Sequence, residues 1–287
     1  MAARLLNTKD QVRNIKKRLK KRLGALKKKK GRPACLACVS IAPKAASKVY
    51  AESQKRLARE LGIECRNIKE GGGVSLKKVE SIIGRLNNDK NVTGIMVHRP
   101  LPRHLDFCRI SEMISPEKDA EGINPVNLGR IITEGIGPTP CTASACMKLI
   151  RRTGIGLKGR EVVIVGHSAT VGKPLSLLLL SRLATVTVCH IGTDERRHLS
   201  EHVRRAEILV AAAGRPGLIK GEWIKKRAIV IDVGITPTKE GLKGDVDFKG
   251  ALGRASFITP VPGGVGPLTS IALMENLTAL YGDVFKR

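Results

Sequence analysis

Hydrophobic residues recur along this chain of 287 residues in two alternating patterns. Short runs rich in Val, Ile and Leu are typical of buried strands, and between them lie longer segments in which apolar residues repeat every three or four positions, as in amphipathic helices. The runs predict strands at residues 34–41, 64–68, 94–97, 161–165, 185–189, 208–211, 229–233 and 256–258. Helices are expected at residues 46–61, 75–87, 142–152 and 172–183.

This alternation predicts an α/β protein with two α/β domains flanking a cleft, the second a Rossmann-like parallel sheet. A stretch rich in Pro and Gly at residues 115–140 is the expected boundary region. Ligands of such folds bind at the carboxyl ends of the strands, so we expect the functional residues there.

Charge changes the interpretation of the first segment. The formal net charge is +27, and residues 1–32 carry fourteen Lys and Arg residues against Asp10 alone. The segment also has apolar residues at helical spacing, which predicts an amphipathic helix with a basic face. Those apolar residues are Leu5, Leu6, Val12, Ile15, Leu19, Leu23 and Leu26. A solvated face is favoured, attraction of an acidic ligand is the alternative, and a targeting peptide is least favoured.

Nucleic acid and membrane are not expected as partners. Lys and Arg suit phosphates, but seven aromatic residues are too few for a base-stacking surface, and the sequence shows no DNA- or RNA-binding motif. No apolar run approaches the roughly 20 residues of a membrane span.

Seven cysteines without a secretory signal indicate reduced thiols and a cytoplasmic location. Cys35 and Cys38 lie three apart on an expected strand, so they are assigned to the core and no metal site is expected.

A glycine-rich turn follows the strand expected at residues 161–165. The string GHSATVGKP occupies residues 166–174 and leads into a Leu-rich helix. Backbone N–H groups at such a helix N-terminus can bind a pyrophosphate, which is the dinucleotide-binding arrangement. The glycine spacing is not the usual GxGxxG, and an ordinary β-α turn is the alternative.

Three motifs together carry a family resemblance. They are PEKDAEG at residues 116–122, GHSATVGKP at residues 166–174 and ITPVPGGVGPLT at residues 258–269, with support from residues 46–50, 97–102 and 231–235. Over essentially its whole length the chain resembles the methylenetetrahydrofolate dehydrogenase/methenyltetrahydrofolate cyclohydrolase family. The resemblance implies a folate-binding catalytic domain at residues 1–122, joined by a C-terminal helix at about 269–287, and an NAD(P)-binding Rossmann domain at residues 123–268.

The resemblance also implies a reaction and a homodimer. A hydride passes from 5,10-methylenetetrahydrofolate to NAD or NADP, and the methenyl product is hydrolysed to 10-formyltetrahydrofolate. Catalytic roles fall to Tyr50, Gln54, His98 and Glu121, with Glu121 in the place of a pterin-recognising Asp. Substrate contacts are implied for Ser47, Tyr50, Val97, His98, Glu121, Pro262, Gly263 and Gly264. Cofactor contacts are implied for Gly166, His167, Ser168, Val171, Gly172, Thr193, Gly214 and Ile235.

Besides Glu121, two further catalytic positions depart from the family's pattern. Gln54 stands where the family has a Lys that is central to hydrolysis, and Lys55 would point about 100° round the helix. Because an amide cannot carry a proton, hydrolysis is expected to be slower by a factor on the order of 10²–10⁴. His98 replaces a family Gln, and in the alternative interpretation it takes over proton handling.

The cofactor positions depart as well. His167 and the stretch at residues 191–193 replace groups that commonly meet the 2′-phosphate of NADP in the family. NAD is therefore slightly favoured over NADP. Two other function classes stay open at this point: a non-catalytic folate- or nucleotide-binding relative, and a nucleic-acid-binding protein that reuses the fold.

Overall fold

The protein folds as two compact units, seen in a computed structural model that describes residues 2–43 and 45–285, apart from the side chains of residues 45–50. One unit comprises Arg13–Thr139 and Ser270–Arg287, and we call it the three-stranded unit. The other comprises Met1–Val12 and Pro140–Thr269, and we call it the six-stranded unit.

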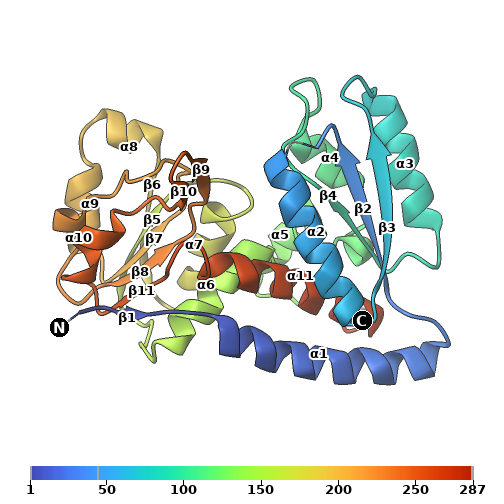
Figure 1. Ribbon diagram of the computed structural model, residues 1–287, viewed down its shortest axis with the longest axis horizontal. Helices are drawn as coiled ribbons and strands as arrows, with labels where there is room; N and C mark the ends of the chain where they lie inside the picture. Colours follow the sequence, from blue (N-terminus) through green and yellow to red (C-terminus); the bar gives the residue numbers. More distant parts are fainter. Residues whose placement is uncertain (1, 44, 286–287) are drawn as a thin grey trace. The chain divides into compact units, whose positions relative to one another are not determined.

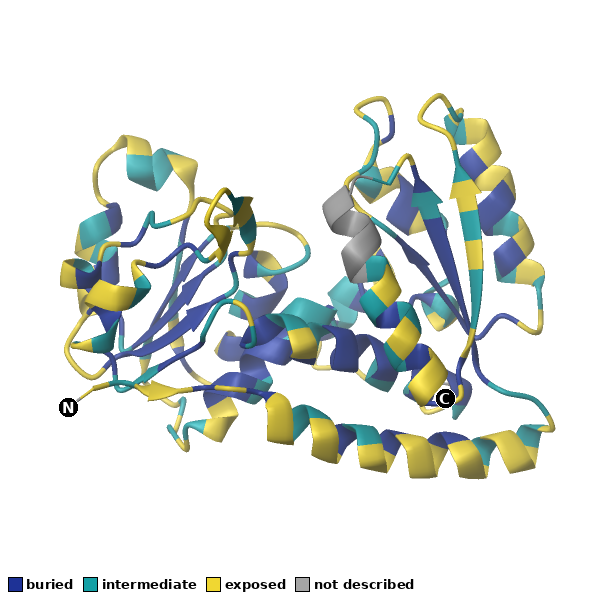
Figure 2. Cartoon of the chain, in the orientation of Figure 1, coloured by how far each residue is buried: buried dark blue, intermediate teal, exposed yellow. Residues whose placement is uncertain are grey.

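The three-stranded unit is built on a parallel sheet in the order β3-β2-β4 (Figure 1). Its strands are β2 (Cys35–Ile41), β3 (Glu64–Glu70) and β4 (Gly94–Val97), with α2 (Ala45–Glu60) and α3 (Leu76–Asn88) between them. Most of β2 and all of β4 are buried, as Figure 2 shows in dark blue. Burial on both faces explains why these strands are continuous apolar runs rather than alternating ones.

The six-stranded unit contains a parallel sheet in the order β1-β11-β8-β7-β5-β6. The strands are β1 (Arg4–Leu5), β5 (Glu161–Val165), β6 (Thr185–Cys189), β7 (Ile208–Ala211), β8 (Ile229–Asp232) and β11 (Phe257–Ile258). The helices α6 (Cys141–Arg152), α7 (Gly172–Leu180), α9 (Leu199–Arg205) and α10 (Phe248–Leu252) belong to the same unit. This parallel sheet confirms the α/β fold and the Rossmann-like second sheet that the sequence predicts.

The remaining elements are mostly short. They are α1 (Lys9–Lys30), α4 (Phe107–Met113), η1 (Pro116–Lys118), α5 (Pro125–Ile132), α8 (Ile191–Glu195), η2 (Gly221–Trp223), the antiparallel pair β9 (Thr236–Thr238) and β10 (Gly241–Lys243), and α11 (Val265–Tyr281). Local capping starts several of the helices. Asn124 accepts a hydrogen bond from the Val126 N–H with Pro125 in the first turn, and Asp106 does the same for Cys108.

The amphipathic first helix is confirmed, but its predicted extent is wrong at the start. Ile15, Leu19 and Leu23 are buried on one side of α1. Leu5 and Leu6 are outside the helix, because the backbone here pairs with β11 and Leu6 N–H donates to Ile258 O at 2.8 Å. In the extended conformation successive side chains point to opposite faces, so Leu5 is 52% exposed and Leu6 only 3%.

The unit limits have a visible physical basis. The side-chain nitrogen of Asn276 on α11 donates to Ala120 O and Thr139 O, at 3.0 and 2.9 Å. These bonds tie the end of the irregular segment to the three-stranded unit, and β1 joins the other sheet. The domain limits expected at residues 122 and 268 stay a prediction.

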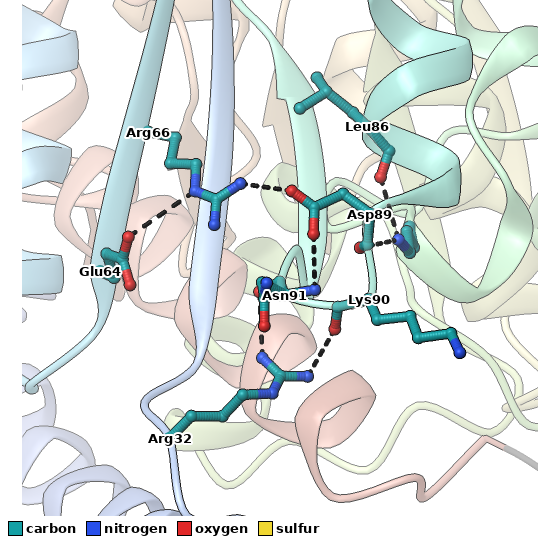
Figure 3. A network of polar contacts seen from close by, with 8 residues as sticks. Arg32, Glu64, Arg66, Leu86, Asp89, Lys90 and Asn91 are labelled. Carbon is teal, nitrogen blue, oxygen red and sulfur yellow. Dashed lines mark hydrogen bonds and ion pairs between the residues drawn. The ribbon is translucent and has the colours of Figure 1, made fainter.

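A polar network fixes the amino ends of the three strands (Figure 3). Asp89, just after α3, accepts hydrogen bonds from the Arg66 guanidinium and from the Asn91 N–H. Arg32, just before β2, donates to Asn91 O at 3.0 Å and to Lys90 O at 2.7 Å. Hydrogen bonds from Asn91 and Arg66 hold the pKa of Asp89 below its usual range. The network leaves the carboxyl ends of the strands available for other groups.

Within the described residues, no helix is both long enough and apolar enough to span a membrane.

Candidate functional site

His98 lies directly after β4, at the carboxyl end of the three-stranded sheet. Its N–H donates to Val39 O at 2.9 Å, which continues the β2–β4 pairing by one residue. Its Nδ1 is 3.2 Å from the Ser40 hydroxyl oxygen. Its Nε2 is buried and has no hydrogen-bond partner in the described part of the chain. Burial lowers the pKa of His98, so the imidazole is neutral near pH 7 and Nε2 is available to a bound molecule.

Gln54 lies on the buried side of α2, one turn before the fully buried Ala58. The Gln54 side chain is 4% exposed, and its Oε1 has no hydrogen-bond partner among the described residues. A buried acceptor left unpaired costs about 1–3 kcal/mol, so this position is suited to a group that a ligand supplies. Lys55 does not take its place, because the Lys55 ammonium pairs with Glu52 at 3.3 Å.

Ser47 and Tyr50 lie on the same helix, before Gln54, and their side chains are outside the described residues. Their implied contacts with folate stay predictions.

Glu121 is held beside β4 by its own backbone neighbours. Ala120 N–H donates to Ile95 O at 3.2 Å, and Val97 N–H reaches a Glu121 carboxylate oxygen at 3.4 Å. Burial raises the pKa of Glu121 to about 7; Arg99 opposes that rise and Asp119 adds to it. The structure therefore brings Val97, His98 and Glu121 together at the end of one strand.

Asp119 organises the loop that carries Glu121, and it is not among the site residues predicted from the sequence. Its carboxylate accepts hydrogen bonds from Gly122 N–H, Asn124 N–H and the Asn127 side chain, at 2.8–2.9 Å. It is fully buried, and burial raises its pKa. Ser40, the partner of His98, was also missed. Its place near the end of the strand next to residues 94–97 is the signal that could have found it.

The glycine turn, residues 166–172, joins β5 to α7 in the six-stranded unit. Gly166 has φ 129°, and a Cβ there would lie 2.3 Å from Ala212 O. A Cβ on Gly172 would lie 1.9 Å from Gly166 O. Ser168 Oγ accepts a hydrogen bond from Val171 N–H at 3.2 Å. His167 and Ser168 are exposed, so this tight turn presents the N-terminus of α7 to solvent, as pyrophosphate binding requires.

In dinucleotide-binding folds, the residues that contact the ribose 2′ position follow the second strand of the unit, which is β6 here. The rings of His167 and His190 meet edge to face, with centroids 5.4 Å apart. Thr193 Oγ1 accepts a hydrogen bond from His190 N–H at 3.2 Å. Asp194 forms an ion pair with Arg215 at 2.8 Å, so neither charge stands alone at this edge.

Two buried aspartates, missed in the sequence analysis, shape the loops at residues 212–214 and 233–246. Asp245 Oδ2 accepts hydrogen bonds from Ala213 and Gly214 N–H, at 2.6 and 2.9 Å. Asp232 accepts from Gly234, Asp245 and Val246 N–H, at 2.9–3.1 Å, and burial raises its pKa to about 7. These bonds position Gly214, and Ile235 is half-exposed beside them.

Pro262, Gly263 and Gly264 lie in the six-stranded unit, just before α11. The Thr8 hydroxyl donates to Gly263 O at 2.9 Å and to Gly264 O at 3.1 Å. Gly263 has φ 104°, a region that favours glycine. The N-terminal segment therefore fixes this loop.

The two buried cysteines of β2, Cys35 and Cys38, are free thiols, and burial raises the pKa of each. Among the described residues, no group of three or more His, Cys, Asp and Glu side chains could hold a metal ion.

Comparisons with known proteins identify the family and support the fold. Residues 6–121 match the model of the tetrahydrofolate dehydrogenase/cyclohydrolase catalytic domain, and residues 140–283 match that of its NAD(P)-binding domain. The chain is 40% identical over 273 residues to the bifunctional protein FolD of Nitratiruptor sp., with 95% of each chain covered.

Two solved structures have nearly the same fold. The bifunctional FolD of Campylobacter jejuni aligns with TM-score 0.93 and 37% identity, covering 99% of this chain and all of the other. The Trypanosoma brucei enzyme, solved with NADP cofactor and an inhibitor, aligns with TM-score 0.94 and 36% identity, with full coverage of both chains. The chain belongs to the tetrahydrofolate dehydrogenase/cyclohydrolase family.

Proposed function

We propose that this protein oxidises 5,10-methylenetetrahydrofolate to 5,10-methenyltetrahydrofolate by hydride transfer to a nicotinamide cofactor. The observation that carries the proposal is the intact glycine turn at the N-terminus of α7, in a chain that matches both domains of the family. The turn would hold the pyrophosphate of a dinucleotide, whose nicotinamide would supply the hydride acceptor. The chain's part is mainly positioning, because the folate nitrogens expel the hydride without acid–base help. A non-catalytic relative is not favoured, since curated relatives such as that of Nitratiruptor are named bifunctional.

The folate pocket would be formed around the end of β4. Glu121, as a carboxylate, can accept hydrogen bonds from the pterin amino and ring N–H groups. The buried Nε2 of His98 and Oε1 of Gln54 have no hydrogen-bond partner among the described residues, so a ligand could satisfy them. Ser47, Tyr50, Val97 and the loop at Pro262, Gly263 and Gly264 complete the proposed substrate contacts.

The cofactor would be held by the glycine turn and the strand ends beside it. The proposed contacts are Gly166, His167, Ser168, Val171, Gly172, Thr193, Gly214 and Ile235.

We favour NAD over NADP, because the Asp194 carboxylate offsets the Arg215 charge at the edge where a 2′-phosphate would need a cation. The proposed assembly is a homodimer in the cytoplasm, and the seven free cysteines suit a reducing compartment.

Hydrolysis of the methenyl product is proposed to be the weaker of the two steps. A buried amide at position 54 accepts and donates hydrogen bonds but cannot transfer a proton. Loss of general acid–base help lowers a rate by a factor on the order of 10²–10⁴.

A second candidate assigns proton transfer to His98. Its pKa is lowered by burial, so it is neutral near pH 7, and the Ser40 hydroxyl at 3.2 Å can orient the ring through Nδ1. Nε2 would then accept the proton of the attacking water.

One set of assays tests the proposed reaction and the two accounts of hydrolysis. Oxidation of methylenetetrahydrofolate is followed with NAD and with NADP, and hydrolysis of the methenyl product is followed separately, for the wild type, Gln54→Lys and His98→Gln. We expect oxidation in all three, a higher kcat/KM with NAD, and hydrolysis that increases at least tenfold in Gln54→Lys. If His98 transfers the proton, wild-type hydrolysis is fast and His98→Gln loses it. Fast wild-type hydrolysis that His98→Gln leaves unchanged contradicts both accounts.

A further inference from the structure

The exposed side of α1 carries a dense row of positive charge that the proposed reaction does not use. We call it the basic face, and it comprises Lys17, Arg18, Lys20, Lys21, Arg22, Lys27, Lys28 and Lys29. All eight residues are exposed, and Figure 2 shows the mostly yellow outer side of this helix. The sequence contains no Asp or Glu between Asp10 and Glu52.

The opposite side of α1 is covered by the three-stranded unit itself. Ile15, Leu19 and Leu23 are buried. Lys16 pairs with Glu60 at the end of α2, and Lys30 pairs with Asp283 at 2.5 Å. By contrast, none of the basic-face side chains has an ion pair with a described residue. Several lie three or four positions apart, where like charges repel each other, so the face is electrostatically unsatisfied in the chain alone.

Within the three-stranded unit, the basic face is remote from the carboxyl end of β4. Glu60 is the last residue of α2, and Arg32, two residues after α1, belongs to the network at the amino ends of the strands (Figure 3). His98 and Glu121 lie at the carboxyl end of β4. A ligand of the basic face is therefore separate from His98 and Glu121.

Contrary to the expectation from the motifs and the aromatic content of the sequence, we propose that the basic face docks into the major groove of duplex DNA through contacts to the phosphates. At 3.6 residues per turn, the eight side chains spread over roughly 220° of the helix circumference. A flat anionic surface could contact only some of these side chains. The major groove of DNA admits an α-helix, and its two rows of phosphates would lie on both sides of the helix. The positive charge of the basic face therefore favours a polyanion as its partner. The wide angular spread of the side chains favours a groove over a flat surface.

The same observations disfavour a membrane and base-specific recognition. An interfacial helix inserts its apolar side into the lipid, but that side of α1 is already buried against the chain. The proposed contacts are to phosphates, which fix the position of a protein on the duplex but carry no sequence information. Binding is therefore expected to be independent of sequence and strongly dependent on salt.

The test compares binding of the whole protein to a 20-base-pair DNA duplex at several salt concentrations. The wild type is expected to bind with a Kd of about 10⁻⁴–10⁻⁶ M near physiological salt. Neutralising four positions, as Lys17→Gln, Lys20→Gln, Lys21→Gln and Lys28→Gln together, should weaken binding at least tenfold. Each lost phosphate contact should reduce the slope of log K against log salt by about 0.9.

A matched control removes the same charge elsewhere. Lys77, Lys78, Lys225 and Lys226 are also exposed, and their joint replacement by Gln should leave the salt slope within one unit of the wild-type value. Methylenetetrahydrofolate oxidation should be the same in both variants, and this readout keeps the failure of the reaction proposal distinct from the failure of DNA binding. The DNA proposal is overturned if the two variants bind DNA equally. It is also overturned if wild type prefers phosphatidylserine vesicles, or binds an A-form RNA duplex as tightly as DNA.

Discussion

The Glu121 carboxyl shows how much one side chain's surroundings decide its chemistry. An acid at this position is visible in the sequence, and so is the motif around it. Its protonation state is not visible, because it depends on burial, on the charge of Arg99 and on the neighbouring Asp119. These groups come together only through the pairing of residues 119–120 with β4.

We predict that folate use depends on the protonation of Glu121. Only the carboxylate form accepts the two pterin N–H bonds, and burial raises the pKa of the group to about 7. Below that pH the acid form dominates, so kcat/KM for methylenetetrahydrofolate should fall about tenfold per pH unit. Steady-state rates between pH 5.5 and 8.5 measure this. Glu121→Gln should have a low and flat profile, whereas an unchanged slope in that variant would show that another group titrates.

At the same scale, Gln54 and His98 mark the limit of sequence reasoning. Both substitutions were recognised as departures from the family's pattern. Each buries a polar atom that has no partner among the described residues. This could not be predicted from the sequence, because it depends on the packing of α2 and on the Ser40 hydroxyl.

At the scale of elements, the long strands and helices were predictable because their apolar periodicity is strong. The strands expected at residues 161–165, 185–189 and 208–211 have the observed bounds. Short elements such as β1 could not be predicted, because a two-residue strand is stabilised by its partner β11 and has no sequence pattern of its own. Leu5 was therefore assigned to a helix that begins four residues later.

The glycine turn supplies a prediction at this scale. Gly172→Ala places a Cβ against Gly166 O at 1.9 Å, so the turn must open. We expect the Kd for the dinucleotide to rise at least tenfold, measured by calorimetric titration, together with a loss of stability. Gly24→Ala is the control. A Cβ there meets nothing within 4 Å on the exposed side of α1, and should stabilise the helix by about 0.5–1 kcal/mol. Unchanged dinucleotide affinity in Gly172→Ala would remove the turn from the proposed cofactor site.

At the scale of the whole molecule, each unit has its own hydrophobic core. One core includes Val39, Ile83 and Ile95 around the three-stranded sheet, and the other includes Val163, Leu209 and Val230. The sequence predicts two α/β domains. It does not show that Met1–Val12 belongs to the six-stranded unit and Ser270–Arg287 to the three-stranded unit. That arrangement depends on long-range pairs such as Thr8 with Gly263 and Asn276 with Thr139.

We predict that the two cores can be weakened separately. Leu277 on α11 is fully buried, with a methyl group next to Gly94 in β4, and Leu277→Ala should cost about 2–5 kcal/mol. Hydrogen exchange should then accelerate at the amides of β2 and β4, while those of β5 and β7 keep their protection. Leu179→Ala in α7, equally buried in the wild type, should do the reverse. Equal acceleration in both sheets by both variants would instead indicate a single cooperative unit.

The return of the chain's last segment to its earlier unit has a consequence for biosynthesis. The three-stranded unit contains residues 13–139, which the ribosome makes early, but also Ser270–Arg287, which it makes only after Pro140–Thr269 of the other unit. A domain normally folds as a unit in the order of its synthesis. Here the three-stranded unit must wait, with the surface that receives Leu277 uncovered, until α11 has been made. The six-stranded unit, complete at Thr269, can finish before it.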